Sequence, residues 1–178
     1  MRLKDMTVTA LFSALICVAA PWTVPVGPIP ITLATFVIYL SAAVLGAKKG
    51  ALAVLVYVLL GTVGLPVFTN FEGGLHKLIG ATGGYIAGYI PLAVIAGLAA
   101  DRFEKLWSYV AGMVLGTVAL YSLGTAWFMF MTKASLSYSL AVCAVPFLPG
   151  DAIKIACASV LATRLRPLLK RTTNAVSV

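Results

Sequence analysis

The chain has 178 residues, of which 61% are hydrophobic and only 10% are charged. Its mean hydropathy of +1.04 excludes a soluble domain of this length, because one compact core could not hide so much apolar surface. The formal net charge of +8 comes from basic residues in small groups between apolar runs. This pattern argues against a nucleic-acid-binding surface and indicates a multi-pass membrane protein.

Apolar runs bounded by prolines or charges predict an all-α bundle of six transmembrane helices, since one crossing takes about 20 residues. The first run leads straight into further apolar runs, so we expect a retained helix and not a cleaved signal peptide. We expect no separate soluble domain, and we expect residues 1–178 to form a single transmembrane domain. In chain order the predicted spans are residues 7–22, 31–47, 51–68, 84–100, 107–131 and 150–165.

Basic residues predict the orientation of this bundle. Six crossings place both termini on the same side, and most of the 13 Lys and Arg residues fall on that side. By the positive-inside rule we expect both termini in the cytoplasm of a prokaryotic cell. The residues concerned are Arg2, Lys4, Lys48, Lys49, Arg102, Lys105, Arg164, Arg166, Lys170 and Arg171.

The connection before the last predicted span is long and partly apolar. Pro146 and Pro149 are expected to hold it extended. Non-helical backbone at membrane depth persists only where protein or water satisfies its polar groups. We therefore expect a re-entrant or lid-like loop here, with Asp151 in the first turn of the helix that follows.

Asp151 and Lys154 place two opposite charges inside the last predicted span. Three residues apart, they lie on one helical face and can pair with each other. Such a pair can be purely structural. However, ionisable groups within a span mark a functional site by default. An acceptor beside a donor in a dry pocket suits a small solute that carries N–H groups and a carboxylate or carbonyl.

A second candidate wall of a binding site combines Asn70 with the run Thr82, Gly83, Gly84 and Tyr85. Glycines expose backbone N–H groups, and the tyrosine offers a ring and a hydroxyl. A tight turn that enters a helix explains the same glycines equally well.

The sequence lacks the residue patterns of ATP hydrolysis, of common catalytic sites and of metal binding. No GxxxxGK[ST] phosphate loop occurs, so we expect the energy for any transport to come from other subunits. Five acidic residues and one histidine assemble no catalytic triad or HExxH motif, so neither an enzyme nor a metal site is expected, and no cofactor is implied. The three cysteines, Cys17, Cys143 and Cys157, are predicted to be packing residues.

Three segments resemble a known family in order and spacing: residues 61–68 (GTVGLPVF), 80–85 (GATGGY) and 146–154 (PFLPGDAIK). They are similar to the BioY family, the biotin-binding S components of energy-coupling factor (ECF) transporters. The resemblance implies a six-helix bundle that binds biotin from outside and works with a transmembrane coupling subunit and two cytoplasmic ATPases.

Ala10 and Ala14 match the small-xxx-small motif of the family's first helix, which the resemblance assigns to docking on the coupling subunit. Ala34 departs from the family, which often has Gln there, and an alanine side chain has no polar atom for such a contact.

The residues and the resemblance together predict a biotin-binding membrane subunit that is not an enzyme. Asp151 would accept from a ureido N–H of biotin, and Lys154 would donate to a ligand oxygen, while Asn70, Thr82 and Tyr85 are weaker candidates. Which end of biotin meets which residue stays open. The alternative is a self-sufficient proton-coupled carrier, or an intramembrane enzyme, that uses Asp151 as its relay.

Overall fold

The computed structural model describes residues 3–24 and 29–175. Each of the six predicted spans overlaps one long helix within these residues: α1 (Leu3–Ala19), α2 (Ala34–Leu45), α3 (Ala47–Thr62), α5 (Gly83–Arg102), α6 (Leu106–Thr132) and α8 (Leu148–Ala175). Shorter elements connect them, namely the helices α4 (Leu75–Ile79) and α7 (Leu136–Cys143) and the 3-10 turns η1 (Thr69–Phe71) and η2 (Val145–Phe147). Two short strands, β1 (Thr23–Val24) and β2 (Ile31–Thr32), pair antiparallel with Thr23 opposite Thr32.

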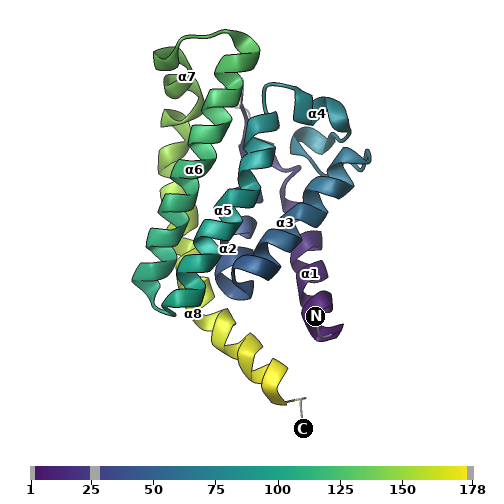
Figure 1. Cartoon of the computed structure of the whole chain (residues 1–178), viewed down its shortest axis with the longest axis vertical. Helices are drawn as coiled ribbons and strands as arrows, with labels where there is room; N and C mark the ends of the chain where they lie inside the picture. The colour runs from purple at the N-terminus through teal and green to yellow at the C-terminus, as the bar shows by residue number, and fades with distance from the viewer. Residues whose placement is uncertain (1–2, 25–28, 176–178) are drawn as a thin grey trace.

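The helices form one elongated bundle (Figure 1). We call the end with α4 and α7 the upper end, and the end with the start of α1 and the last turns of α8 the lower end. The beginning and the end of the described chain therefore lie at the same end, as an even number of crossings requires. Arg2 lies outside the described residues, as does the side chain of Arg171. The cytoplasmic location of the lower end stays a prediction.

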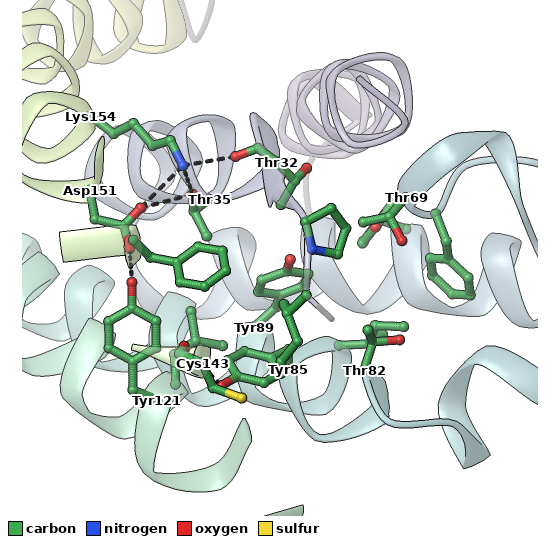
Figure 2. A pocket seen from close by; sticks show the side chains of 17 residues that line it. Thr32, Thr35, Thr69, Thr82, Tyr85, Tyr89, Tyr121, Cys143, Asp151 and Lys154 are labelled. Atoms are coloured by element: carbon green, nitrogen blue, oxygen red, sulfur yellow. Dashed lines mark hydrogen bonds and ion pairs between the residues drawn. The ribbon is translucent and has the colours of Figure 1, made fainter. Parts of the chain in front are cut away.

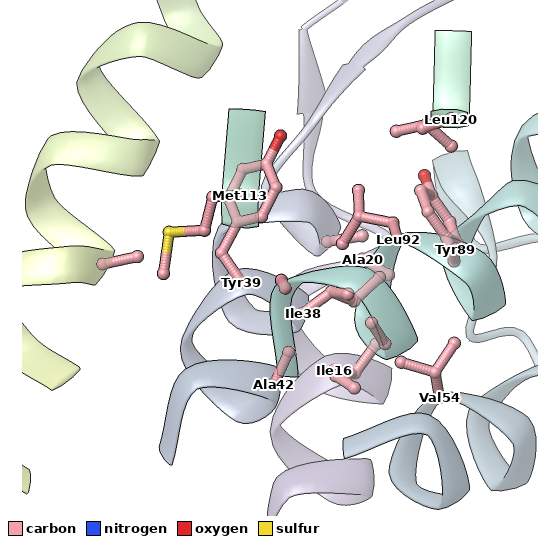
Figure 3. Close-up of a cluster of buried hydrophobic side chains, with 14 of the residues drawn as sticks. Ile16, Ala20, Ile38, Tyr39, Ala42, Val54, Tyr89, Leu92, Met113 and Leu120 are labelled. Atoms are coloured by element: carbon pink, nitrogen blue, oxygen red, sulfur yellow. The ribbon is translucent and has the colours of Figure 1, made fainter. Parts of the chain in front are cut away.

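Helices α5 and α6 lie side by side and make the most extensive helix–helix contact among the described residues (Figure 1). Glycines make this contact possible because side chains at their positions would collide with the facing helix. A Cβ atom on Gly84 would lie 2.2 Å from the Cβ of Trp127, and one on Gly112 would lie 2.5 Å from the Cβ of Ala99. Around this pair, the core includes the fully buried Ile38, Leu92 and Met113 (Figure 3).

Three segments of the described chain are long and apolar enough to cross a membrane, over Gly83–Arg102, Leu106–Thr132 and Leu136–Lys170. The helix Ala34–Leu45 is apolar but shorter. The helices α1 and α3 have 17 and 16 residues, fewer than the roughly 20 of a typical crossing. The molecule is thus a mostly helical membrane protein, and the count of six crossings stays a prediction.

The expectation of an extended approach to the last helix is wrong. Helix α7 and turn η2 precede α8, which begins at Leu148. Pro146 lies at the start of η2, and Pro149 lies in the first turn of α8. Proline is compatible with such positions because the first backbone N–H groups of a helix have no intrahelical partner. Asp151 does lie in the first turn of α8, as predicted.

Helix α3 begins four residues before the predicted span of residues 51–68 and ends six residues before that span ends. It starts at Ala47, whose N–H donates to the Asp101 carboxylate at 2.9 Å. This cap comes from a distant part of the chain and is invisible in the local sequence. The helix ends at Thr62, and Gly64 then adopts a positive φ of 113° that glycine favours.

Candidate binding site

A cavity lies where three helices begin. Thr35 is in the first turn of α2, Tyr85 in the first turn of α5 and Asp151 in the first turn of α8, and all three line the cavity. It holds about 610 Å³ of space between atoms, including its opening to solvent.

Lys154 forms the polar end of the cavity with three acceptors. Its Nζ donates to Asp151 Oδ1 at 3.1 Å, to the Thr32 carbonyl at 2.8 Å and to Thr35 Oγ1 at 2.9 Å. An ammonium group has three N–H donors, so every one of them has a partner. The Thr32 carbonyl is held in place because the Thr32 hydroxyl donates to the Ala20 carbonyl at 2.9 Å.

Asp151 is buried beside this ammonium group, and both of its carboxylate oxygens accept hydrogen bonds. Oδ1 accepts from Lys154 and, at 3.5 Å, from the Thr35 hydroxyl, while Oδ2 accepts from the Tyr121 hydroxyl of α6. The start of α8 also favours a negative charge through the helix dipole. An ionised carboxylate offers about four acceptor positions, so Asp151 keeps capacity for one further donor. The two charges cancel, and the polar end is neutral as a whole.

Aromatic side chains form the middle of the cavity. Tyr57 packs edge-on against Phe68, with ring centroids 5.6 Å apart, and lies 6.4 Å from Tyr89. The Tyr85 hydroxyl donates to the Cys143 carbonyl at 3.1 Å, which fixes that ring. These rings offer a mainly apolar wall.

Figure 2 shows Asp151, Lys154 and Tyr121 at one end of the cavity, and Thr69 and Thr82 at the other. Tyr85 and Tyr89 lie between these ends. The cavity thus joins a neutral hydrogen-bonding end, an aromatic middle and a second end with hydroxyl groups.

The structure brings together four of the predicted substrate-binding residues, since Asp151, Lys154, Thr82 and Tyr85 all line the cavity. Asn70 is exposed instead, with a positive φ of 62°, and it accepts a hydrogen bond from the Thr23 hydroxyl at 2.5 Å.

Gly83 and Gly84 are buried in helix contacts and are not among the cavity-lining residues. A Cβ atom on Gly83 would lie 1.8 Å from the Leu78 carbonyl oxygen. Close packing therefore explains these glycines without a contact to a ligand.

Sequence reasoning missed several cavity residues. Thr32, Thr35 and Tyr121 complete the polar end, while Tyr57 and Tyr89 complete the aromatic middle. Tyrosines well inside apolar runs were the one available signal, because a buried hydroxyl usually needs a partner. Threonines are too common in membrane helices to carry such a signal.

Two further predicted positions lie away from the cavity. Ala10 and Ala14 are exposed on the outer face of α1, whereas Phe12 and Ile16 are buried against the bundle. Ala34 is buried and its N–H donates to the Thr32 hydroxyl at 3.0 Å, but its methyl group offers no polar contact.

Comparisons with known proteins agree on one family. Residues 1–171 match the model of the BioY family. The chain is 43% identical over 166 residues to a protein of Thermotoga maritima named "Biotin transporter BioY", and this match covers 93% of the chain and 98% of that protein. It is 37% identical to a "Probable biotin transporter BioY" of Pyrococcus horikoshii, with the same coverage. A solved structure, described as the S-component for biotin from an ECF-type ABC transporter, superposes with a TM-score of 0.85 at 28% identity, over 93% of this chain and 92% of that one.

Proposed function

The chain belongs to the BioY family, and we propose that it is the biotin-binding membrane subunit of an ECF-type transporter. In this proposal it captures biotin from outside the cell, and a separate coupling subunit with ATPases supplies the energy. It acts as a binding and transport subunit and not as an enzyme. The observation that carries the proposal is the cavity at the starts of α2, α5 and α8, which offers a neutral polar end and an aromatic middle.

The polar end favours the ureido group of biotin over its carboxylate. Asp151 has acceptor capacity for a ureido N–H, and the charge of Lys154 is already compensated by Asp151. A second carboxylate at this end would lack a matching cation inside an apolar surrounding, which is costly. A ureido group brings N–H donors and a carbonyl acceptor without net charge, so it replaces or extends the existing hydrogen bonds.

The rest of the cavity suits the rest of the biotin molecule. The rings of Tyr57, Tyr85 and Tyr89 provide a wall for the apolar fused bicycle. The flexible chain then runs toward Thr69 and Thr82, whose hydroxyl groups can donate to the carboxylate. Gly83, Gly84 and Asn70 support the cavity wall and the adjoining loop in this proposal, without contact to biotin.

The outer surface of α1 is consistent with a contact to a separate coupling subunit. Ala10 and Ala14 expose a strip of small side chains on the outside of the bundle, where another helix can approach closely. The sequence itself has no phosphate loop for ATP hydrolysis. We therefore propose α1 as the contact with the coupling subunit, with both termini in the cytoplasm.

Transport assays in proteoliposomes test this function and separate it from a proton-coupled carrier. Vesicles that contain the chain, the coupling subunit and the ATPases should accumulate labelled biotin when ATP is supplied on the cytoplasmic side. Vesicles with the chain alone and an imposed pH gradient should not accumulate it. Accumulation that follows the pH gradient without ATPases would contradict the proposal and favour the carrier.

A further inference from the structure

A second cavity lies at the lower end of the bundle, far from the biotin site. It opens between the starts of α1 and α3, the end of α2 and the last turns of α8, and holds about 600 Å³ of space between atoms. Its polar lining consists of Asp5, Lys49, Arg166 and Lys170. We call it the Arg166 cavity.

Arg166 is the buried member of this group, with a side chain that is 6% exposed. Its Nη1 donates to the Ala43 carbonyl at 2.6 Å, and its Nη2 donates to Asp101 Oδ1 at 2.7 Å. Its Nε is buried and has no hydrogen-bond partner among the described residues, since Glu104 Oε1 is 3.6 Å away. Glu104 lies within ion-pair range of this N–H but forms no hydrogen bond with it, so the position favours an acceptor at a shorter distance.

The two lysines of the cavity are paired but accessible. Lys49 donates to Asp5 at 2.6 Å with a side chain that is 37% exposed, and Lys170 donates to Glu104 with a side chain that is 54% exposed. The Lys170–Glu104 pair is exposed and contributes little to stability, whereas the Lys49–Asp5 pair is half-buried. The Lys170 ammonium group can therefore turn toward a new anion at small cost, and the partly exposed Lys49 ammonium group can contact an anion while it keeps Asp5 as a partner.

The remaining lining is aliphatic: Val8, Val44, Leu45 and Leu169. A ligand that fills the cavity must therefore combine an anionic group with apolar atoms. The surrounding end of the bundle also carries the exposed basic residues Lys4, Lys48, Arg102 and Lys105, which attract anions to it.

We propose that the Arg166 cavity binds the phosphate head group of an anionic membrane lipid. Arg166 Nε, Lys49 and Lys170 donate to the phosphate oxygens, and the aliphatic side chains contact the glycerol and the first acyl carbons. Basic pockets between transmembrane helices suit such head groups. A free phosphate has the same charge but would leave the aliphatic lining unfilled. The site is distinct from the biotin cavity and requires only that the bundle lies in a membrane.

Native mass spectrometry of the purified full chain tests the proposal with phosphatidylglycerol as probe and phosphatidylcholine as neutral comparison. Wild-type protein should retain phosphatidylglycerol in preference to phosphatidylcholine. Lys49→Gln with Lys170→Gln should weaken this retention by about tenfold or more, because two charge-assisted contacts are lost. Lys49→Arg with Lys170→Arg keeps both charges and should retain the lipid.

Lys48→Gln with Lys105→Gln is the matched control, since it removes the same charge at the same end from exposed residues outside the cavity lining. This variant should retain the lipid, and unchanged biotin affinity in every variant shows that the fold is intact. Equal loss in the cavity variant and the control would overturn the proposal in favour of diffuse attraction. Glycerol phosphate that displaces the lipid at equal concentration would overturn the lipid as occupant. Unchanged lipid retention with lost co-purification of the coupling subunit would assign the cavity to a protein contact instead.

Discussion

The hydroxyl of Tyr121 donates a hydrogen bond to the carboxylate of Asp151, which joins the middle of α6 to the first turn of α8. Because Lys154 and Thr35 bind the other carboxylate oxygen, the Asp151 side chain is fixed from three directions. A fixed acceptor binds a ligand N–H with little further loss of side-chain entropy. Tyr121 therefore acts as a positioning residue in the proposed site.

Replacement of Tyr121 by Phe removes this hydrogen bond but keeps the ring. We expect biotin affinity to fall about tenfold, the effect of one hydrogen bond to a charged group. Isothermal titration calorimetry measures the change. Tyr138→Phe is the control, since Tyr138 is exposed on α7 and is not among the cavity-lining residues. Equal affinity in both variants would remove Tyr121 from the site.

Replacement of Lys154 by Ala leaves Asp151 without its compensating charge in a buried position. We expect biotin affinity to fall by about a hundredfold or more, as for a lost charge-assisted contact. Lys77→Ala serves as control, because Lys77 of α4 pairs with Glu72 at the upper end and does not line the cavity. A folded Lys154→Ala protein with wild-type affinity would mean that the pair is only structural.

Parts of the site follow from the sequence because they are local. The spacing of Asp151 and Lys154 predicts their shared helical face, and the structure confirms that they pair. Tyr121, Thr32 and Thr35 were missed because their contacts to this pair join residues that are 30 to 122 positions apart in the chain. No local pattern encodes such distances.

The fold likewise has features that the local sequence predicts and features that depend on distant residues. Apolar runs locate the long helices, but the start of α3 depends on the distant Asp101 cap, so its predicted boundary was late. Helix α7 was missed because the run Leu136–Cys143 is short and interrupted by serines. The glycine-rich run 80–85 was compatible with a binding wall and equally with a tight turn into a helix. In the structure Gly83 and Gly84 lie in close contacts with neighbouring helices.

Cysteine labelling tests the orientation that the basic residues predict. In a variant without Cys17, Cys143 and Cys157, single cysteines replace Ser137 in α7 or Lys105 between α5 and α6, both of which are exposed. An impermeant maleimide added to intact cells should label the cysteine at position 137 and not that at 105. Labelling at 105 in intact cells would contradict a cytoplasmic lower end.

Bulky side chains on the outer face of α1 test the proposed contact with the coupling subunit. Ala10→Leu with Ala14→Leu should leave biotin affinity nearly unchanged and reduce both co-purification with that subunit and biotin uptake, because close helix approach is blocked. Ala152→Leu with Ala156→Leu places the same change on exposed residues of α8 and serves as the matched control. Full uptake by the α1 variant would exclude docking there, whereas joint loss of stability and binding would mean that α1 packs within the bundle.

Calorimetric titration of the purified wild-type protein with biotin, biotin methyl ester and diaminobiotin tests the central claim most directly. We expect tight binding of biotin and only a modest loss for the methyl ester, because our proposal places the carboxylate at the hydroxyl-lined end, where Thr69 and Thr82 line the cavity. Diaminobiotin lacks the ureido carbonyl and should bind about a hundredfold more weakly. The polar end with Asp151 and Lys154 then has no uncharged ureido group to bind. No detectable heat with biotin, or a larger loss for the ester than for diaminobiotin, would contradict this assignment of the cavity.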